Sequence, residues 1–175
     1  MLISATVDVV AQKGLRGLTF RAVAEHAQVN NSLVAHHFGN RAALLAAALE
    51  WAVEQSIEST HLLDLSSEER FADALLSSVT ERPELQAFQY EMILEARRSD
   101  LFRAPVTRLY DRYQTAAEDA LRAIGFDDDV DRVARWLFAA LDGIVLQSMA
   151  GVSDAQLRSA IHSMWTVLQR EVDRR

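Results

Sequence analysis

Residues 19–38, with the sequence TFRAVAEHAQVNNSLVAHHF, decide how the first part of this chain folds. Four apolar residues follow the i, i+3, i+4, i+7 spacing of one helix face: Phe20, Val23, Ala24 and Ala27. Thr19 stands directly before them, where a helix N-cap is expected. The residues Gln28-Val29-Asn30 form a short turn, and a second helix is expected from about Asn31 to His37. Two short helices joined by a tight turn are typical of a helix-turn-helix.

The second of these helices has one apolar side and one polar side. We expect Val34 and Phe38 to face inward, while Asn31, Ser32, Ala35 and His36 face outward. Short polar side chains on the outer face can approach base edges and phosphates in the major groove. Any small helical hairpin could share this pattern, so the spacing by itself favours DNA binding without proving it.

The remainder of the chain is also expected to be helical, which makes the fold class all-α. Gly and Pro together account for 8 of 175 residues, and no segment shows sustained alternation of apolar and polar residues. Periodicity predicts about nine helices, at roughly 2–13, 20–27, 31–37, 41–59, 67–80, 83–99, 101–123, 128–150 and 154–172. Asn40, a capping box of Ser66 and Glu69, and Ser153 are expected to open three of them.

Composition excludes several classes of protein. There is no cysteine, so a disulfide framework and a cysteine zinc site are impossible. No apolar stretch approaches the ~18 residues of a membrane span, and Ser4, Thr6 and Asp8 interrupt the N-terminal apolar run, which argues against a signal peptide. We therefore expect a cytoplasmic protein without a membrane partner. Residues 1–50 carry four basic and three acidic side chains, although the whole chain has a net charge of −7.

Motifs at fixed spacing carry a resemblance to a known family. They are K-G-x-x-G-L-T at 13–19, R-x-V-A-E-x-A at 21–27, H-H-F-G at 36–39 and the basic residue Arg41. Residues 2–50 closely resemble the N-terminal domain of the TetR family of bacterial transcriptional regulators. The helical remainder, with the LDGIVLQ stretch at 141–147, loosely resembles the ligand-binding and dimerisation region of that family. The resemblance implies a DNA-binding domain at 1–50, with its motif at 19–38, joined through a long fourth helix to a helical domain at 51–175.

The resemblance also implies which residues meet operator DNA. Thr19 and Arg21 would contact the DNA backbone, and His37 and Arg41 would contact phosphate around the next helix corner. The groove-facing positions would be Asn30, Asn31, Ser32, Leu33 and His36. The histidines could instead be helix-end residues that hydrogen-bond carbonyls, Asn30 and Asn31 could serve only as turn and cap residues, and Arg41 could pair with Glu residues on the fourth helix.

Several positions depart from the pattern of the family. Gln28 stands where the family often has Gly, Asn31 where it often has Lys or Arg, and Ala35 where it often has Tyr. Leu33 replaces a common Thr and suggests an apolar contact with a thymine methyl. The sequence also starts at the first helix, without the basic arm common in the family, so we expect either a truncated start or weaker DNA binding.

A homodimer and a small-molecule site are the further expectations for residues 51–175. The last predicted helix has a wide apolar stripe, and the helix before it is apolar on more than one side. Together they predict a dimer interface that includes Trp136, Ala139, Gly143, Ile161, Trp165 and Leu168. A pocket for a largely apolar effector is predicted from Phe71, Phe88, Met92, Tyr110, Tyr113 and Gln114. Packing inside the chain is the alternative explanation for both sets of residues.

No pattern supports catalysis, a cofactor or a metal site. The sequence GVSDA at 151–155 loosely resembles a nucleophile elbow, but a helix rather than a strand precedes it. The five histidines show no metal-ligand spacing, and the acidic run at 127–131 fits a helix start better than a calcium loop. The sequence therefore gives no support for an enzyme, and the resemblance implies a ligand-responsive transcriptional regulator, a repressor as the first expectation. The alternative is a helical carrier or interaction protein that has lost specific DNA binding.

Overall fold

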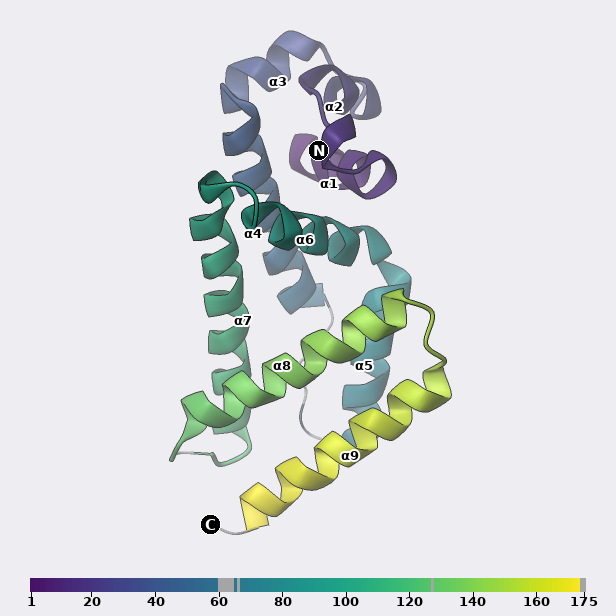
Figure 1. The fold of residues 1–175 in the computed structure, drawn as a ribbon, viewed down its shortest axis with the longest axis vertical. Helices are drawn as coiled ribbons and strands as arrows, with labels where there is room; N and C mark the ends of the chain where they lie inside the picture. The colour runs from purple at the N-terminus through teal and green to yellow at the C-terminus, as the bar shows by residue number, and fades with distance from the viewer. Residues whose placement is uncertain (60–64, 66, 127, 174–175) are drawn as a thin grey trace. The chain divides into compact units, whose positions relative to one another are not determined.

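The computed structural model describes residues 1–59, 65, 67–126 and 128–173, and within these ranges all regular structure is helical (Figure 1). The all-α class predicted from the sequence is confirmed. The α-helices of the described chain are α1 (Leu2–Lys13), α2 (Phe20–His26), α3 (Asn31–Phe38), α4 (Arg41–Ser59), α5 (Glu68–Glu81), α6 (Pro83–Ala96), α7 (Arg103–Ala123), α8 (Val130–Met149) and α9 (Asp154–Asp173). Two short 3-10 helices, η1 (Leu15–Gly17) and η2 (Asp100–Phe102), precede α2 and α7. No described helix is long and apolar enough to cross a membrane.

The first of two compact units comprises Met1–Ser56 and Glu84–Tyr110. It therefore contains α1 to α3, most of α4, α6 and the start of α7 (Figure 1). Its core consists of fully buried or nearly fully buried apolar side chains that include Val7, Val23, Val34, Leu44, Leu45, Phe88 and Met92. Within this unit Gln89 Nε2 donates to Ser56 Oγ at 2.9 Å, and this buried hydrogen bond joins α6 to α4.

The second compact unit comprises Ile57–Pro83 and Asp111–Arg175. Here α5, α8 and α9 pack on one another, with α8 and α9 lying side by side (Figure 1). Its fully buried side chains include Phe71, Leu121, Phe126, Leu137, Ile161 and Leu168. Two polar links hold α9 to α5, because Arg158 Nη2 donates to Asp73 Oδ1 at 2.7 Å and His162 Nδ1 lies 2.8 Å from Glu68 Oε1.

The predicted boundary at residue 50 falls inside α4, which continues without a break to Ser59. The division into domains at 1–50 and 51–175 stays a prediction. In the compact units, residues 84–110 cluster with the N-terminal helices, and this grouping could not be seen in the local periodicity of the sequence.

Helix ends differ from the sequence predictions at three places. The side chain of Ser67 caps α5 by accepting the Arg70 amide at 3.3 Å, whereas the predicted capping residue, Ser66, lies outside the described residues. α6 ends at Ala96 rather than near residue 99, because the chain enters the 3-10 turn η2 before α7 begins. α8 begins at Val130, since Asp129 has a left-handed backbone with φ 54°. Asp127, predicted for the first turn of α8, also lies outside the described residues.

Candidate nucleic-acid interface

The first three helices assemble around short local signals in the sequence. Thr19 is the N-cap of α2, and its hydroxyl accepts the Ala22 amide at 3.0 Å. Val23 and Ala24 on the opposite side of α2 are buried, so this helix is held by its apolar face and presents its N-terminal residues to solvent. The predicted cap is confirmed. Of the predicted inner face, Val23 and Ala24 are buried, whereas Phe20 and Ala27, at the two ends of the helix, are half-buried.

The turn between α2 and α3 depends on one residue with an unusual backbone. Gln28 has φ 56°, in the left-handed region that L-residues other than Asn and Asp rarely occupy. The Val29 amide then donates back to the Ala24 carbonyl oxygen at 2.9 Å and closes the end of α2. Asn30 follows as the N-cap of α3, where its Oδ1 accepts the Ser32 amide at 2.9 Å and the Ser32 hydroxyl at 3.0 Å.

The second helix of the motif presents the side chains that the sequence predicted. Val34 is fully buried, which fixes the orientation of α3 against the rest of the unit. The outward positions Asn31, Ser32, Leu33, Ala35, His36 and His37 are all exposed. Phe38 is half-buried rather than fully inside, because it is the last residue of the helix. The predicted contacts of these exposed residues with DNA stay predictions, but nothing in the unit covers them.

The basic side chains of the interface already have partners within the chain. Arg21 Nε donates to Glu25 Oε1 at 2.7 Å, one turn further along α2, and both side chains are exposed. This hydrogen bond, with the charge of the guanidinium, holds the pKa of Glu25 below its usual value. The same bond, with the charge of the Glu25 carboxylate, raises the pKa of Arg21. Arg41 Nη2 donates to the Leu15 carbonyl oxygen at 2.5 Å, which ties the start of α4 to η1. Arg41 was predicted as a phosphate contact, and its guanidinium retains further N–H donors for that role.

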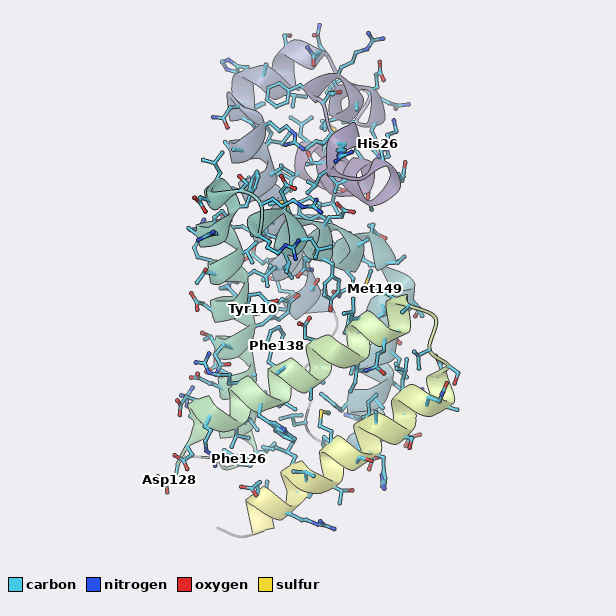
Figure 2. All side chains as sticks on the ribbon, in the orientation of Figure 1. His26, Tyr110, Phe126, Asp128, Phe138 and Met149 are labelled. Atoms are coloured by element: carbon cyan, nitrogen blue, oxygen red, sulfur yellow. The ribbon has the colours of Figure 1, made fainter. Side chains whose placement is uncertain are left out.

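One interaction of this region was not predicted from the sequence. His26 Nε2 on α2 lies 3.1 Å from Asp8 Oδ2 on α1, and this contact joins two helices that pack on each other. Figure 2 labels His26. The two residues are 18 positions apart, so no helical spacing relates them. Only the fold of α1 against α2 brings them together.

The residues predicted to line an effector pocket fall into both compact units. Phe88, Met92 and Tyr110 belong to the first unit, where Phe88 and Met92 are fully buried and Tyr110 is 37 % exposed. Phe71, Tyr113 and Gln114 belong to the second.

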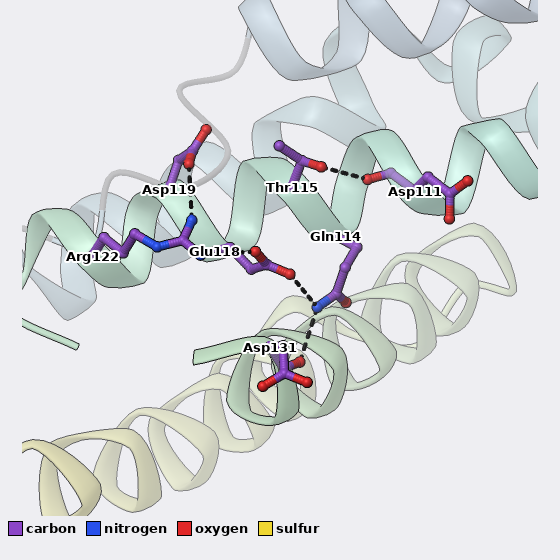
Figure 3. Close-up of polar contacts among 7 residues, drawn as sticks. All are labelled: Asp111, Gln114, Thr115, Glu118, Asp119, Arg122 and Asp131. Carbon is purple, nitrogen blue, oxygen red and sulfur yellow. Dashed lines mark hydrogen bonds and ion pairs between the residues drawn. The ribbon is translucent and has the colours of Figure 1, made fainter. Parts of the chain in front are cut away.

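Each of the three residues in the second unit has a partner within that unit. The Tyr113 ring stacks on that of Phe138, which Figure 2 labels, with centroids 4.9 Å apart. The ring centroids of Phe71 and Trp165 lie 5.7 Å apart. Gln114 Nε2 donates to Glu118 Oε1 and to the Asp131 carbonyl oxygen, so its amide joins α7 to the start of α8 (Figure 3). The pocket itself stays a prediction.

The residues predicted for a dimer interface also separate into two groups. Ile161 and Leu168 are fully buried in the core of the second unit, where α9 packs on α5 and α8. Trp165 is half-buried on the same helix, beside Phe71. Trp136 is 40 % exposed, Ala139 is exposed and Gly143 is partly exposed. The exposed stripe of α8 continues to Leu146, which is 52 % exposed and was not singled out from the sequence. Its signal was present, since the spacing from Trp136 to Ala139, Gly143 and Leu146 follows one helix face.

No group of three or more His, Asp and Glu side chains is placed to hold a metal ion among the residues that the structure describes. The His26 and Asp8 pair and the His162 and Glu68 pair each bring two such groups together.

Comparisons with known proteins agree with this architecture. Residues 2–68 match the family described as bacterial regulatory proteins, tetR family, and residues 66–167 match the family described as tetracyclin repressor-like, C-terminal domain. The HTH-type transcriptional regulator CymR of Pseudomonas putida is 26 % identical over 157 residues, covering 85 % of this chain and 77 % of CymR.

Solved structures show the same fold over nearly the whole chain. The crystal structure of a TetR-family transcriptional regulator from Rhodococcus sp. superposes with a TM-score of 0.78 and 25 % identity, covering 95 % of each chain. The multidrug binding protein EbrR, solved in complex with imidazole, superposes with a TM-score of 0.68 and 27 % identity, covering 93 % of this chain and 92 % of EbrR.

Proposed function

The chain belongs to the TetR family of bacterial regulatory proteins and is a DNA-binding transcriptional regulator, and we propose that it is a homodimeric repressor released from its operator by a small molecule. The observation that supports DNA binding is the outward surface of α3. Six residues between positions 31 and 37 are exposed on this helix, and the seventh, Val34, is buried and holds the helix in place. A helix held in this way can enter the major groove while its partner helix α2 crosses the backbone.

The proposed dimer uses the exposed face of α8. Trp136 and Leu146 leave large apolar surface uncovered in the single chain, and Ala139 and Gly143 between them are small enough for a second helix to approach closely. Ile161 and Leu168 are buried in the core, and the role proposed for them is to hold α9 against α8, the helix that carries the interface. Two copies related by a twofold axis would place two α3 helices in successive major grooves, one turn of DNA apart.

The proposed effector is a small and largely apolar molecule. We propose contacts with the predicted lining residues of the second unit, Phe71, Tyr113 and Gln114, and the imidazole complex of EbrR gives a related protein with a small heteroaromatic compound bound. α4 is the element that can carry the response, because it is one continuous helix from Arg41, beside η1, to Ser59. The effector must bind the DNA-free conformation better than the DNA-bound one, since equal affinity for both would shift nothing.

The decisive experiment is a selection of duplexes from a random pool with the full chain, followed by binding titrations on the selected sequence. We expect a two-fold symmetric site that is bound at least ~10³-fold more tightly than unrelated DNA. The variant that combines Asn31→Ala and His36→Ala should lose most of this preference. His162→Ala is the matched control, because His162 is an exposed histidine of α9 in the other unit.

A reporter gene behind the selected site then distinguishes a repressor from an activator. Repression that is relieved by a compound which also raises the melting temperature of the protein would support the whole proposal. If no sequence is enriched, the regulator proposal fails in favour of the alternative, a helical small-molecule carrier or interaction protein.

A further inference from the structure

The outward surface of α3 retains few hydrogen-bonding groups with which to read a base pair. The Ser32 hydroxyl donates to Asn30 Oδ1, and the same oxygen accepts the Ser32 amide, so both groups serve the cap of the helix. Residues 22–40 contain no Lys or Arg, the side chains that most often contact guanine in the major groove. Asn31, His36 and His37 are the polar side chains that remain on this surface, and Leu33 and Ala35 add apolar groups beside them.

Leu33 is placed to make an apolar contact. It lies in the first turn of α3, and its side chain is 36 % exposed beside the fully buried Val34. The N-terminal residues of a recognition helix are those that approach base edges. Ala35, on the other flank of the outward face, is exposed as well and offers a methyl group.

The major groove offers one apolar group to these side chains, the 5-methyl group of thymine. We propose that Leu33 is a specificity-determining residue that reads a thymine methyl in each half-site of the operator. This inference rests on the proposed function, because it needs α3 to enter the major groove. The free energy of the contact comes from removing both the leucine side chain and the methyl group from water.

Uracil tests the contact directly, because it pairs with adenine as thymine does but has no 5-methyl group. Each thymine of the selected half-site is replaced in turn by deoxyuridine, and each duplex is titrated with the full chain. We expect one position at which the replacement weakens binding by about fourfold, the factor that corresponds to one buried methyl group. Leu33→Ala should bind the unmodified duplex more weakly and should show no further loss on the deoxyuridine duplex.

The matched control is Leu94→Ala, because Leu94 is another exposed leucine of the same unit, on α6 and 62 % exposed. This variant should keep the full sensitivity to deoxyuridine. The inference is overturned if no thymine is sensitive in the wild-type protein, or if Leu33→Ala keeps the wild-type sensitivity. These results are distinct from a failure of the proposed function, in which the wild-type chain would select no sequence at all. The wild-type scan alone can overturn the inference, so it does not depend on how the variant folds.

Discussion

The backbone amide of Val29 donates to the carbonyl oxygen of Ala24 at 2.9 Å, and this bond closes the turn that sets the direction of α3 relative to α2. The chain can make it because the intervening Gln28 adopts φ 56°. A left-handed residue at the end of a helix is most often Gly, which has no Cβ to clash with the following carbonyl oxygen. The turn of the DNA-binding motif therefore carries a local strain that a different residue could relieve.

Gln28→Gly should stabilise the protein. The left-handed conformation costs an L-residue ~1–2 kcal/mol, whereas glycine loses somewhat more backbone freedom on folding, so we expect a net gain of about 0.5–1 kcal/mol in the free energy of unfolding. Urea unfolding followed by circular dichroism measures it. Gln28→Ala is the control and should change little, because alanine has the same strained backbone. A glycine variant less stable than the wild type would show that the Gln28 side chain contributes more than its backbone costs.

Glu25→Gln should strengthen DNA binding by a few-fold at low salt. The substitution removes a negative charge from the surface proposed to contact the DNA backbone. It also releases Arg21 from its ion pair with Glu25, in which Nε and Oε1 lie 2.7 Å apart. Arg21→Ala should act in the opposite direction and make the dependence of log K on log[salt] shallower by about 1.8, for one phosphate contact in each half of a dimer. Salt titrations of both variants measure this, and an unchanged slope for Arg21→Ala would exclude Arg21 as a phosphate contact.

The same pair has a defined pH dependence in the free protein. The pKa of Glu25 is lowered in the folded chain by the hydrogen bond from Arg21 and by its charge. The pair therefore stabilises the fold above the ordinary pKa of a glutamate, and this stabilisation is lost as the pH falls through the lowered value. The effect should be small, because both side chains are exposed, and it should be absent from Glu25→Gln.

Trp136→Glu combined with Leu146→Glu should convert the dimer to a monomer. Both side chains lie on the exposed face of α8, and two carboxylates per chain would have to be buried there without partners. Sedimentation velocity at micromolar concentration measures the change. Leu94→Glu on α6 is the matched control and should leave the dimer intact. A monomeric wild-type chain, or a double variant that remains dimeric, would show that this face of α8 is not the interface.

Local sequence determined most of the structure of residues 1–50. The caps Thr19, Asn30 and Asn40 were predictable because each accepts an amide two or three residues further on, and such bonds depend on spacing alone. The inward position of Val34 and the exposure of its neighbours followed from helical periodicity in the same way. The family could also be identified from motifs within this stretch, since they lie at fixed distances along the chain.

The tertiary structure decided which of several possible partners each helix face contacts. α9 carries a wide apolar stripe that predicted a dimer interface, with a core helix as the alternative. In the structure α9 packs on α5 and α8, and Ile161 and Leu168 are fully buried. Gln114 was predicted as a ligand contact from helical spacing alone, whereas only the fold brings its amide nitrogen to the carbonyl oxygen of Asp131, 17 residues away (Figure 3). Contacts of this kind depend on how helices pack in space. The helical repeat of 3.6 residues makes it possible to predict from the sequence which face of a helix is apolar, but it does not show which element packs against that face.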